Sequence, residues 1–358
     1  MSRFHRLAVA RVDRETRDAV AITFAVPEDL QTLFGFEPGQ HLTLRAGIDG
    51  QDVRRSYSIC SAAQEGALRI AVKRHVGGVF SNWANDTIKP GDMLDVTPPL
   101  GHFNVPHDGA KRKHYVGFAA GSGITPLLSI VKSTLAAEPL SEFTLFYGNR
   151  ASGTVMFKEE LAAIKDRNLE RFNLVHVLSR EPQDIPLLHG RIDRERADAL
   201  LAHWVDLDGV DAVFVCGPNG MMESVAEALK ARGFPDAKVR IERFAASIPQ
   251  HEHKVTRPAE PGHTECEVTV VQDGVTRTFM LEKSKQSILE AGLAAGLELP
   301  YSCKGGVCST CRAKLVAGEV DMDVNFALED YEVARGFVLT CQSYPVTDKV
   351  TVDYDQTG

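Results

Sequence analysis

The sequence predicts a multidomain protein in which an antiparallel β-barrel, an α/β domain with a parallel sheet and a small α+β domain follow one another. Three observations support this fold class. The first hundred residues contain short β-branched runs separated by turns, the next part alternates apolar strands with helical stretches, and the last part carries closely spaced cysteines. A chain of 358 residues is long enough for roughly two to three domains.

The barrel is predicted from residues 1–108. Its apolar runs are separated by turns such as Glu37-Pro38-Gly39 and Lys89-Pro90-Gly91-Asp92, and regular spacing of short strands and turns is typical of a barrel. The expected strands are Leu7–Val12, Val20–Val26, His41–Leu44, Ser56–Cys60, Leu68–Lys73 and Met93–Val96. A short helix is expected near Asn82–Asp86.

The α/β domain is predicted from residues 109–245. Its alternation of strand and helix predicts a parallel sheet that binds a ligand at the carboxyl ends of its strands. The expected strands are Tyr115–Ala119, Phe143–Tyr147, Phe172–Leu178 and Ala212–Cys216. The expected helices are Pro126–Leu135, Lys158–Lys165, Arg194–His203 and Met221–Lys230.

Residues 246–263 are rich in proline and charge and lack apolar periodicity, so we predict a linker there. The last domain, residues 264–358, begins with an expected hairpin of Glu267–Gln272 and Thr276–Leu281. A short helix, Ser287–Ala295, leads into the cysteine-rich loop.

Composition excludes several classes of protein. No basic stripe with interleaved aromatic residues supports nucleic-acid binding, and no apolar run approaches the roughly 20 residues of a membrane span. The N-terminus lacks the apolar core of a signal peptide. Cys60, Cys216 and Cys266 are isolated thiols, which suits a reducing compartment. We therefore expect a cytoplasmic protein that binds neither nucleic acid nor membrane.

The net charge of −8 is concentrated in the last domain. Residues 264–358 contain 15 acidic and 8 basic residues, a net charge of −7, so the rest of the chain is nearly neutral. An acidic domain is explained by a solvated surface alone, or by a face that docks a basic partner. Both interpretations stay open at this point.

The cysteines of the last domain predict a metal cluster. The spacing C-x4-C-x2-C with a distant fourth cysteine is formed by Cys303, Cys308, Cys311 and Cys341. Four thiolates at this spacing hold a plant-type [2Fe–2S] cluster, whereas a zinc site more often shows two C-x2-C pairs. Gly305 and Gly306 let backbone N–H groups reach the inorganic sulfides.

Two elements of the barrel predict a phosphate-bearing ligand. Arg55 and Tyr57 share one face of a strand, where the guanidinium could clamp a phosphate and the phenol could cover a ring, with Ser58 bonding a flavin nitrogen. An exposed basic strand explains these residues equally well. Gly78 and Ser81 stand before a helix, which makes an anion site and favours the first interpretation.

Two glycine-rich strand ends predict a second nucleotide in the α/β domain. Gly121 and Gly123 lie between a strand and a helix whose first turn holds Thr125 and a proline, so the backbone can approach a pyrophosphate. Another strand ends at Cys216 and Gly217, at the edge where such sheets bind ligands. A buried, inert thiol is one interpretation of Cys216, and we prefer a thiol beside a nicotinamide.

Arginines at two further strand ends bear on the choice of nicotinamide cofactor. Arg150 follows one strand, and Ser179 and Arg180 follow the next. Guanidinium groups suit the 2′-phosphate of NADPH, whereas NAD sites more often carry an acid, so we expect NADPH to be preferred and NADH to be a poorer donor. Two solvated strand ends would explain the same arginines.

Together these motifs resemble the ferredoxin–NADP reductase superfamily joined to a plant-type ferredoxin domain, which implies a β-grasp fold for residues 264–358. The domain order is similar to that of the reductases of bacterial multicomponent oxygenases, and within them to the reductases that serve phenylacetyl-CoA epoxidases. The resemblance covers essentially the whole chain. Ala120 departs from it, because the family often has glycine at that position.

The resemblance implies roles for individual residues. It implies that Arg55 binds the FAD pyrophosphate, Tyr57 covers the isoalloxazine face and Ser58 lies near the flavin N5 atom. The remaining implied cofactor contacts are Gly78 and Ser81 for FAD phosphate, Gly121, Gly123 and Thr125 for the dinucleotide pyrophosphate, Cys216 and Gly217 for the nicotinamide, and Glu242 and Phe244 for closure of the flavin site. The implied catalytic residues are Ser58, Cys216 and Glu242.

The same resemblance implies electron transfer from NADPH through FAD and the [2Fe–2S] cluster to an oxygenase of the di-iron type, by a reductase that is monomeric on its own. Flavin is the cofactor that joins hydride chemistry to one-electron chemistry, and the protein supplies orientation. Two other functions stay open: a stand-alone NAD(P)H oxidoreductase, and a reductase of a different aromatic-ring or alkane oxygenase. A non-enzymatic electron carrier is disfavoured by the complete nucleotide motifs.

Overall fold

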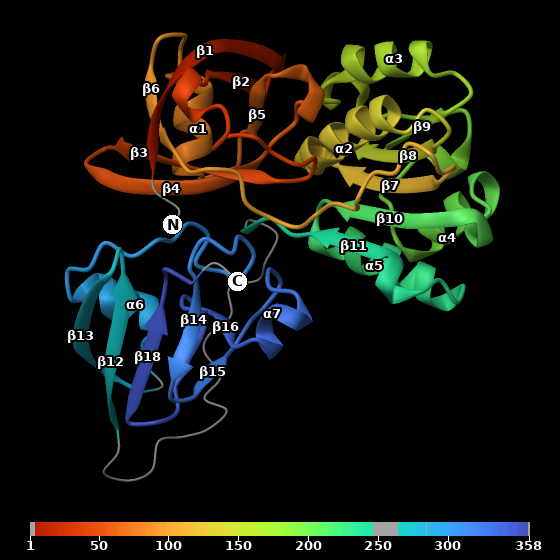
Figure 1. Ribbon diagram of the computed structural model, residues 1–358. Helices are drawn as coiled ribbons and strands as arrows, with labels where there is room; N and C mark the ends of the chain where they lie inside the picture. The colour runs from red at the N-terminus through yellow and green to blue at the C-terminus, as the bar shows by residue number, and fades with distance from the viewer. Residues whose placement is uncertain (1–3, 246–263, 284, 357–358) are drawn as a thin grey trace. The chain divides into compact units, whose positions relative to one another are not determined.

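The computed structural model describes residues 4–245, 264–283 and 285–356, so the expected linker at 246–263 lies outside the described residues. The chain forms two compact units, one mainly from residues 5–245 and the other mainly from residues 264–356 (Figure 1). In the described residues no helix has the length and apolar character needed to cross a bilayer.

The first domain is an antiparallel barrel. Its six-stranded sheet has the order β4-β3-β6-β1-β2-β5. An isolated antiparallel bridge between Ile59, just after β4, and Ile70 in β5 joins the two ends of the sheet and closes the barrel. The strands are β1 (His5–Thr16), β2 (Ala19–Ala25), β3 (His41–Ile48), β4 (Gln51–Ser58), β5 (Leu68–Lys73) and β6 (Met93–Val96).

Two elements of the barrel differ from the sequence-based expectation. The strand expected at Ser56–Cys60 lies earlier, at Gln51–Ser58. The prediction was misplaced because exposed polar residues of β4 interrupt the apolar pattern on which it relied. The helix expected at Asn82–Asp86 begins at Val79, directly after Gly78, and forms α1 (Val79–Asp86).

The second domain contains a wholly parallel sheet in the order β11-β10-β7-β8-β9, as expected. Helices α2 and α3 cover one face and α4 and α5 the other (Figure 1). The strands are β7 (His114–Ala120), β8 (Glu142–Asn149), β9 (Phe172–Leu178), β10 (Val210–Cys216) and β11 (Val239–Glu242). The helices are α2 (Ile124–Ala137), α3 (Lys158–Arg167), α4 (Arg194–Trp204) and α5 (Asn219–Ala231).

The order of these strands creates a switch point between β7 and β10. From β7 the chain moves outward through β8 to β9, and it then returns to add β10 on the other side of β7. Open α/β sheets bind ligands outside the carboxyl ends of strands at such a point. The loops that follow β7 and β10 are therefore the expected binding edge.

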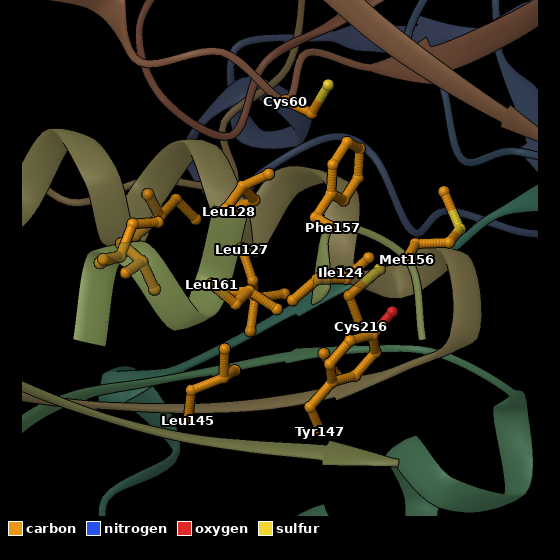
Figure 2. Close-up of a cluster of buried hydrophobic side chains, with 14 of the residues drawn as sticks. Cys60, Ile124, Leu127, Leu128, Leu145, Tyr147, Met156, Phe157, Leu161 and Cys216 are labelled. Atoms are coloured by element: carbon orange, nitrogen blue, oxygen red, sulfur yellow. The ribbon is translucent and has the colours of Figure 1, made fainter. Parts of the chain in front are cut away.

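A single apolar cluster joins the barrel to the α2–α3 face of the second domain. The barrel contributes Ala19, Ala21, Cys60 and Ala71, and most other members come from β7, β8, β10, α2 and α3. Figure 2 shows part of this cluster, with Cys60 on the barrel side of Phe157. The two domains therefore share buried surface, and they form one unit.

The last domain has the expected β-grasp fold. In its five-stranded sheet, β13-β12-β18-β14-β16, the first strand, β12, pairs in parallel with the last, β18. A box of Ser287 and Glu290 caps α6 (Ile288–Ala294). The strands are β12 (Glu265–Gln272), β13 (Val275–Glu282), β14 (Arg312–Ala317), β15 (Val320–Met322), β16 (Phe337–Leu339), β17 (Ser343–Pro345) and β18 (Lys349–Asp353), and the second helix is α7 (Asp330–Ala334).

Candidate functional site

The four predicted cluster ligands come together as two pairs of thiols. The thiols of Cys303 and Cys308 are hydrogen-bonded to each other, and so are those of Cys311 and Cys341. The backbone N–H of Gly305 donates to the Cys303 sulfur at 3.3 Å. Three of these residues follow α6 on one loop, whereas Cys341 follows β16.

This donor set fits a cluster with two irons. Two thiol pairs suit two metal centres. Positive φ angles at Lys304, Gly306 and Ser309 fold the loop back on itself. The thiol neighbour first and burial second raise the pKa of both Cys303 and Cys311, and the positive charge of bound iron would favour their thiolate forms.

The predicted flavin face lies on β4. Ser58 is 3 % exposed, and its buried Oγ has no hydrogen-bond partner among the described residues. A buried hydroxyl without a partner is costly, and a flavin nitrogen or oxygen at this place would satisfy it. The Tyr57 ring packs 5.5 Å from the Phe80 ring, and Arg55 is exposed, with one N–H donated to the Arg54 carbonyl at 2.7 Å. These features fit FAD.

The second phosphate element precedes α1. Gly78 is its N-cap, and a Cβ there would lie 2.5 Å from the Oγ of Ser81. That Oγ accepts the backbone N–H of His75 at 3.1 Å. The Ser81 hydroxyl therefore shapes the turn, which leaves the first N–H groups of α1 as the natural contacts of a phosphate.

The two glycine-rich loops of the α/β domain meet at the switch point. A Cβ at Gly123 would lie 2.1 Å from the carbonyl oxygen of Cys216, and one at Gly217 would lie 3.1 Å from the Cβ of Ala120. Only glycine allows this close approach. The Thr125 hydroxyl donates to the Ser122 carbonyl at 3.0 Å and fixes the first turn of α2. The structure thus brings together the residues predicted to hold the dinucleotide.

Cys216 is fully buried inside the apolar cluster, near Ile124 and Tyr147 (Figure 2). Burial first and the Glu242 carboxylate second raise its pKa well above the ordinary value, so it is a neutral thiol. Glu242 is its partner on the neighbouring strand β11, and Phe244 packs against the same cluster. The burial agrees with a packing role, and the position at the strand end agrees with a place beside the nicotinamide.

The predicted 2′-phosphate residues are neighbours at the sheet edge. The backbone N–H of Ser179 donates to the Asn149 carbonyl at 2.9 Å, and that of Arg180 donates to the Arg150 carbonyl at 2.7 Å. Both arginine side chains are exposed. Two cationic groups are therefore placed next to each other beyond β8 and β9.

Sequence reasoning missed Lys73, the last residue of β5. Its Nζ would lie 3.5 Å from a Cβ on Gly121, so the barrel places a cation beside the dinucleotide loop. Burial first and the positive charge of Arg150 second lower the pKa of Lys73. A bound anion, such as a phosphate group, would stabilise both cations. A single lysine at a strand end gives no sequence signal that links it to a loop 48 residues later.

Three family models match the chain in the order of its domains. The oxidoreductase FAD-binding domain matches residues 6–105, the oxidoreductase NAD-binding domain matches residues 118–227, and the 2Fe-2S iron-sulfur cluster binding domain matches residues 270–346.

The chain is also similar to components of oxygenases along its whole length. It is 46 % identical to one of the subunits of 1,2-phenylacetyl-CoA epoxidase of Escherichia coli K12, covering 100 % of this chain and 99 % of that protein. It is 35 % identical to the ferredoxin reductase component of 3-ketosteroid-9-alpha-monooxygenase of Rhodococcus rhodochrous, covering 97 % and 96 %.

Among solved structures, phthalate dioxygenase reductase, described as modular for electron transfer from pyridine nucleotides to [2Fe–2S], superposes with a TM-score of 0.59. The two chains are 26 % identical, and the match covers 98 % of each. The chain therefore belongs to the ferredoxin–NADP reductase-type reductases with a C-terminal [2Fe–2S] domain, and it is an NAD(P)H-dependent flavin iron–sulfur oxidoreductase that serves an oxygenase.

Proposed function

We propose that this reductase passes electrons from NADPH to an oxygenase that epoxidises phenylacetyl-CoA. The observation that carries the proposal is the 46 % identity to the 1,2-phenylacetyl-CoA epoxidase component, which covers 100 % of this chain and 99 % of that protein. The 3-ketosteroid and glycine betaine reductases are 35 % and 28 % identical over similar lengths. Because these two reductases serve other oxygenases, a different oxygenase is the alternative partner of this chain.

The residues divide the work between two bound nucleotides. FAD, when bound, supplies the step from hydride to single electrons. Tyr57 would cover the flavin ring, Ser58 would donate its unpaired hydroxyl to it, and Arg55 would hold the FAD pyrophosphate. The other proposed contacts are Gly78 and Ser81 for FAD phosphate, Gly121, Gly123 and Thr125 for the dinucleotide pyrophosphate, Cys216 and Gly217 for the nicotinamide, and Glu242 and Phe244 for closure of the site.

The preference for NADPH is supported by the adjacent strand ends beyond β8 and β9. Arg150 and Arg180 are linked through their backbones and exposed, so both guanidinium groups can reach one 2′-phosphate, with the Ser179 hydroxyl beside them.

The proposed docking face for the oxygenase lies on the cluster domain. Phe326 and Tyr331 are large apolar residues that are 45 % and 56 % exposed, and the Phe326 N–H donates to the carbonyl of Gly306 in the cluster loop. Acidic residues accompany them in sequence: Asp321, Asp323, Glu329 and Asp330. Exposed apolar residues accompanied by acidic ones suit a partner that offers apolar and basic residues.

Further parts of the proposal concern the partner and the setting. The oxygenase is of the di-iron type, and the reductase is a monomer in the cytoplasm, where its three isolated thiols stay reduced. The domain limits are residues 1–108, 109–245 and 264–358, with a linker at 246–263.

The test is reconstitution with separate oxygenases. The holoenzyme should support product formation by a phenylacetyl-CoA epoxidase, coupled to NADPH oxidation, and should support 3-ketosteroid hydroxylation much more slowly. The reverse order of the two rates would transfer the assignment to the alternative partner. NADPH oxidation that yields a small-molecule product with no oxygenase present would instead indicate a stand-alone oxidoreductase.

A further inference from the structure

A row of alternating charges crosses the boundary between the barrel and the α/β domain. Arg69 of β5 pairs with Glu15 of β1 at 2.7 Å and with Glu160 of α3 at 2.9 Å. Lys132 of α2 pairs with Glu160 at 2.7 Å and also with Glu65 of the barrel. This charged row, Glu15–Arg69–Glu160–Lys132–Glu65, therefore joins the two domains at two places.

The centre of the charged row is half-buried, whereas Glu65 at its end is exposed. The side chains of Arg69 and Lys132 are 13 % and 11 % exposed, so salt screens their pairs much less than surface pairs. Burial would raise the pKa of Glu160, but the hydrogen bond to Lys132 and the charges of Arg69 and Lys132 outweigh it and lower the pKa. Glu160 is therefore an ionised carboxylate shared by two cations.

The backbone of Phe157 indicates that the contact between the two domains holds a defined conformation. It is the N-cap of α3 and has a φ of 57°, a left-handed conformation that bulky residues rarely adopt. Its N–H donates to Glu15 across the domain boundary at 3.3 Å, and its ring lies 4.9 Å from the Arg69 guanidinium. Such strain persists where the surroundings determine the conformation, and it clusters at functional sites.

The same boundary fixes α2, the helix that begins at the dinucleotide loop. The Ser129 hydroxyl donates to the Ser61 carbonyl of the barrel at 2.7 Å, and the Ala63 N–H of the barrel donates to the Ser133 hydroxyl at 3.3 Å. With Lys132, these contacts tie one side of α2 to the barrel, and the loop Gly121–Gly123 runs directly into that helix.

We propose that the charged row is a positioning device for hydride transfer. It holds the dinucleotide loop and the flavin face of β4 at one fixed separation. The apolar cluster beneath the row supplies cohesion, but apolar contact tolerates sliding, whereas a shared carboxylate between two cations fixes register. Hydride transfer depends steeply on this register, because a misplacement of about 1 Å can cost about a hundredfold in rate. The inference rests on the nicotinamide-to-flavin step and not on the identity of the oxygenase.

The test uses Glu160→Gln, which keeps the size of the side chain and removes its charge. The holoenzyme is mixed with saturating NADPH, and separately with NADH, without oxygen or oxygenase, and flavin reduction is followed by absorbance. We expect the limiting rate to fall about tenfold, with the dissociation constant of NADP⁺ and the flavin content within about twofold of the parent. The charge-transfer absorbance between nicotinamide and flavin should weaken, and hydrogen exchange at the Phe157 amide should accelerate.

Matched variants separate positioning from general damage. Asp198→Asn removes the exposed pair with Arg232 inside the α/β domain, 2.6 Å long, and should change none of these quantities. Glu160→Asp should restore part of the limiting rate. If Glu160→Gln does not fold, the more exposed Glu65→Gln should give a smaller fall of the same kind.

Two results would overturn the proposal: an unchanged limiting rate with a lower thermal midpoint, which would make the row purely structural, or weaker nucleotide binding with an unchanged limiting rate. Because no oxygenase is present, neither result depends on the assignment of the partner.

Discussion

The unit of residues 5–245 and the cluster domain solve two different problems of electron transfer. The first is nearly neutral and joins two domains through a shared apolar cluster and a half-buried charged row. The cluster domain carries a net charge of −7 on 95 residues and exposes Phe326 and Tyr331, and the Phe326 N–H bonds the cysteine loop at Gly306. Hydride transfer needs two bound molecules in contact, whereas a single electron has to leave for another protein. The shared internal surface of residues 5–245 suits the first need, and the proposed acidic docking face would serve the second.

The largest effect is expected from a substitution that removes the function of the cluster domain and leaves that of residues 5–245 intact. Cys308→Ser removes one ligand of the cluster, so reduction of cytochrome c and of the oxygenase should fall by about a hundredfold or more. Ferricyanide, which accepts electrons from flavin, should still be reduced at the parent rate. Flavin absorbance is the control, and iron and sulfide analysis reports the cluster. Equal loss of both activities would show that the two regions are not separable in this way.

A smaller effect is expected at the nucleotide edge of the first region. Replacing Arg150 and Arg180 together by alanine should lower the NADPH/NADH ratio of kcat/KM by about tenfold or more, because each charge-assisted hydrogen bond is worth about 1.5–3 kcal/mol. Asp198→Asn in the same domain is the control. An unchanged ratio would mean that both arginines are solvated strand ends that do not bind the 2′-phosphate of NADPH.

The smallest effect concerns how pH acts on the charged row. The pKa of Glu160 lies below its ordinary value of 4.5, so its carboxylate stabilises the folded state above pH 4.5. As the pH falls below 4.5 the unfolded chain takes up the proton first, and the stabilisation is lost. The parent should exceed Glu160→Gln by about 1–3 kcal/mol in free energy of unfolding at about pH 7. Urea unfolding from about pH 7 down to about pH 3.5 should show this difference shrinking, and a constant difference would contradict it.

The sequence predicted the features that depend on local spacing. The four cysteines, the glycine-rich strand ends and the hairpin around Asp273 have signals within a few residues of one another, and the structure has each of them where expected. Strand β4 was misplaced because its polar outer residues carry no hydrophobic pattern.

The features that sequence reasoning missed join distant parts of the chain. Arg69 and Glu160 are 91 residues apart, and Glu15 and Phe157 are 142 apart. Each is an ordinary charged or apolar residue in its own segment. Their pairing exists only after the barrel and the α/β domain have packed against each other, so no local pattern could predict it.

The order of electron flow is tested most directly with a chain that ends after Ala245. This chain keeps the barrel, the α/β domain and all proposed contacts of both nucleotides, and it has its own buried clusters. It should bind FAD, reduce ferricyanide with NADPH at close to the intact rate, and fail to support turnover of the phenylacetyl-CoA epoxidase. Oxygenase turnover equal to that of the intact chain would show that the [2Fe–2S] cluster is not the obligatory relay, and the proposed path would be wrong.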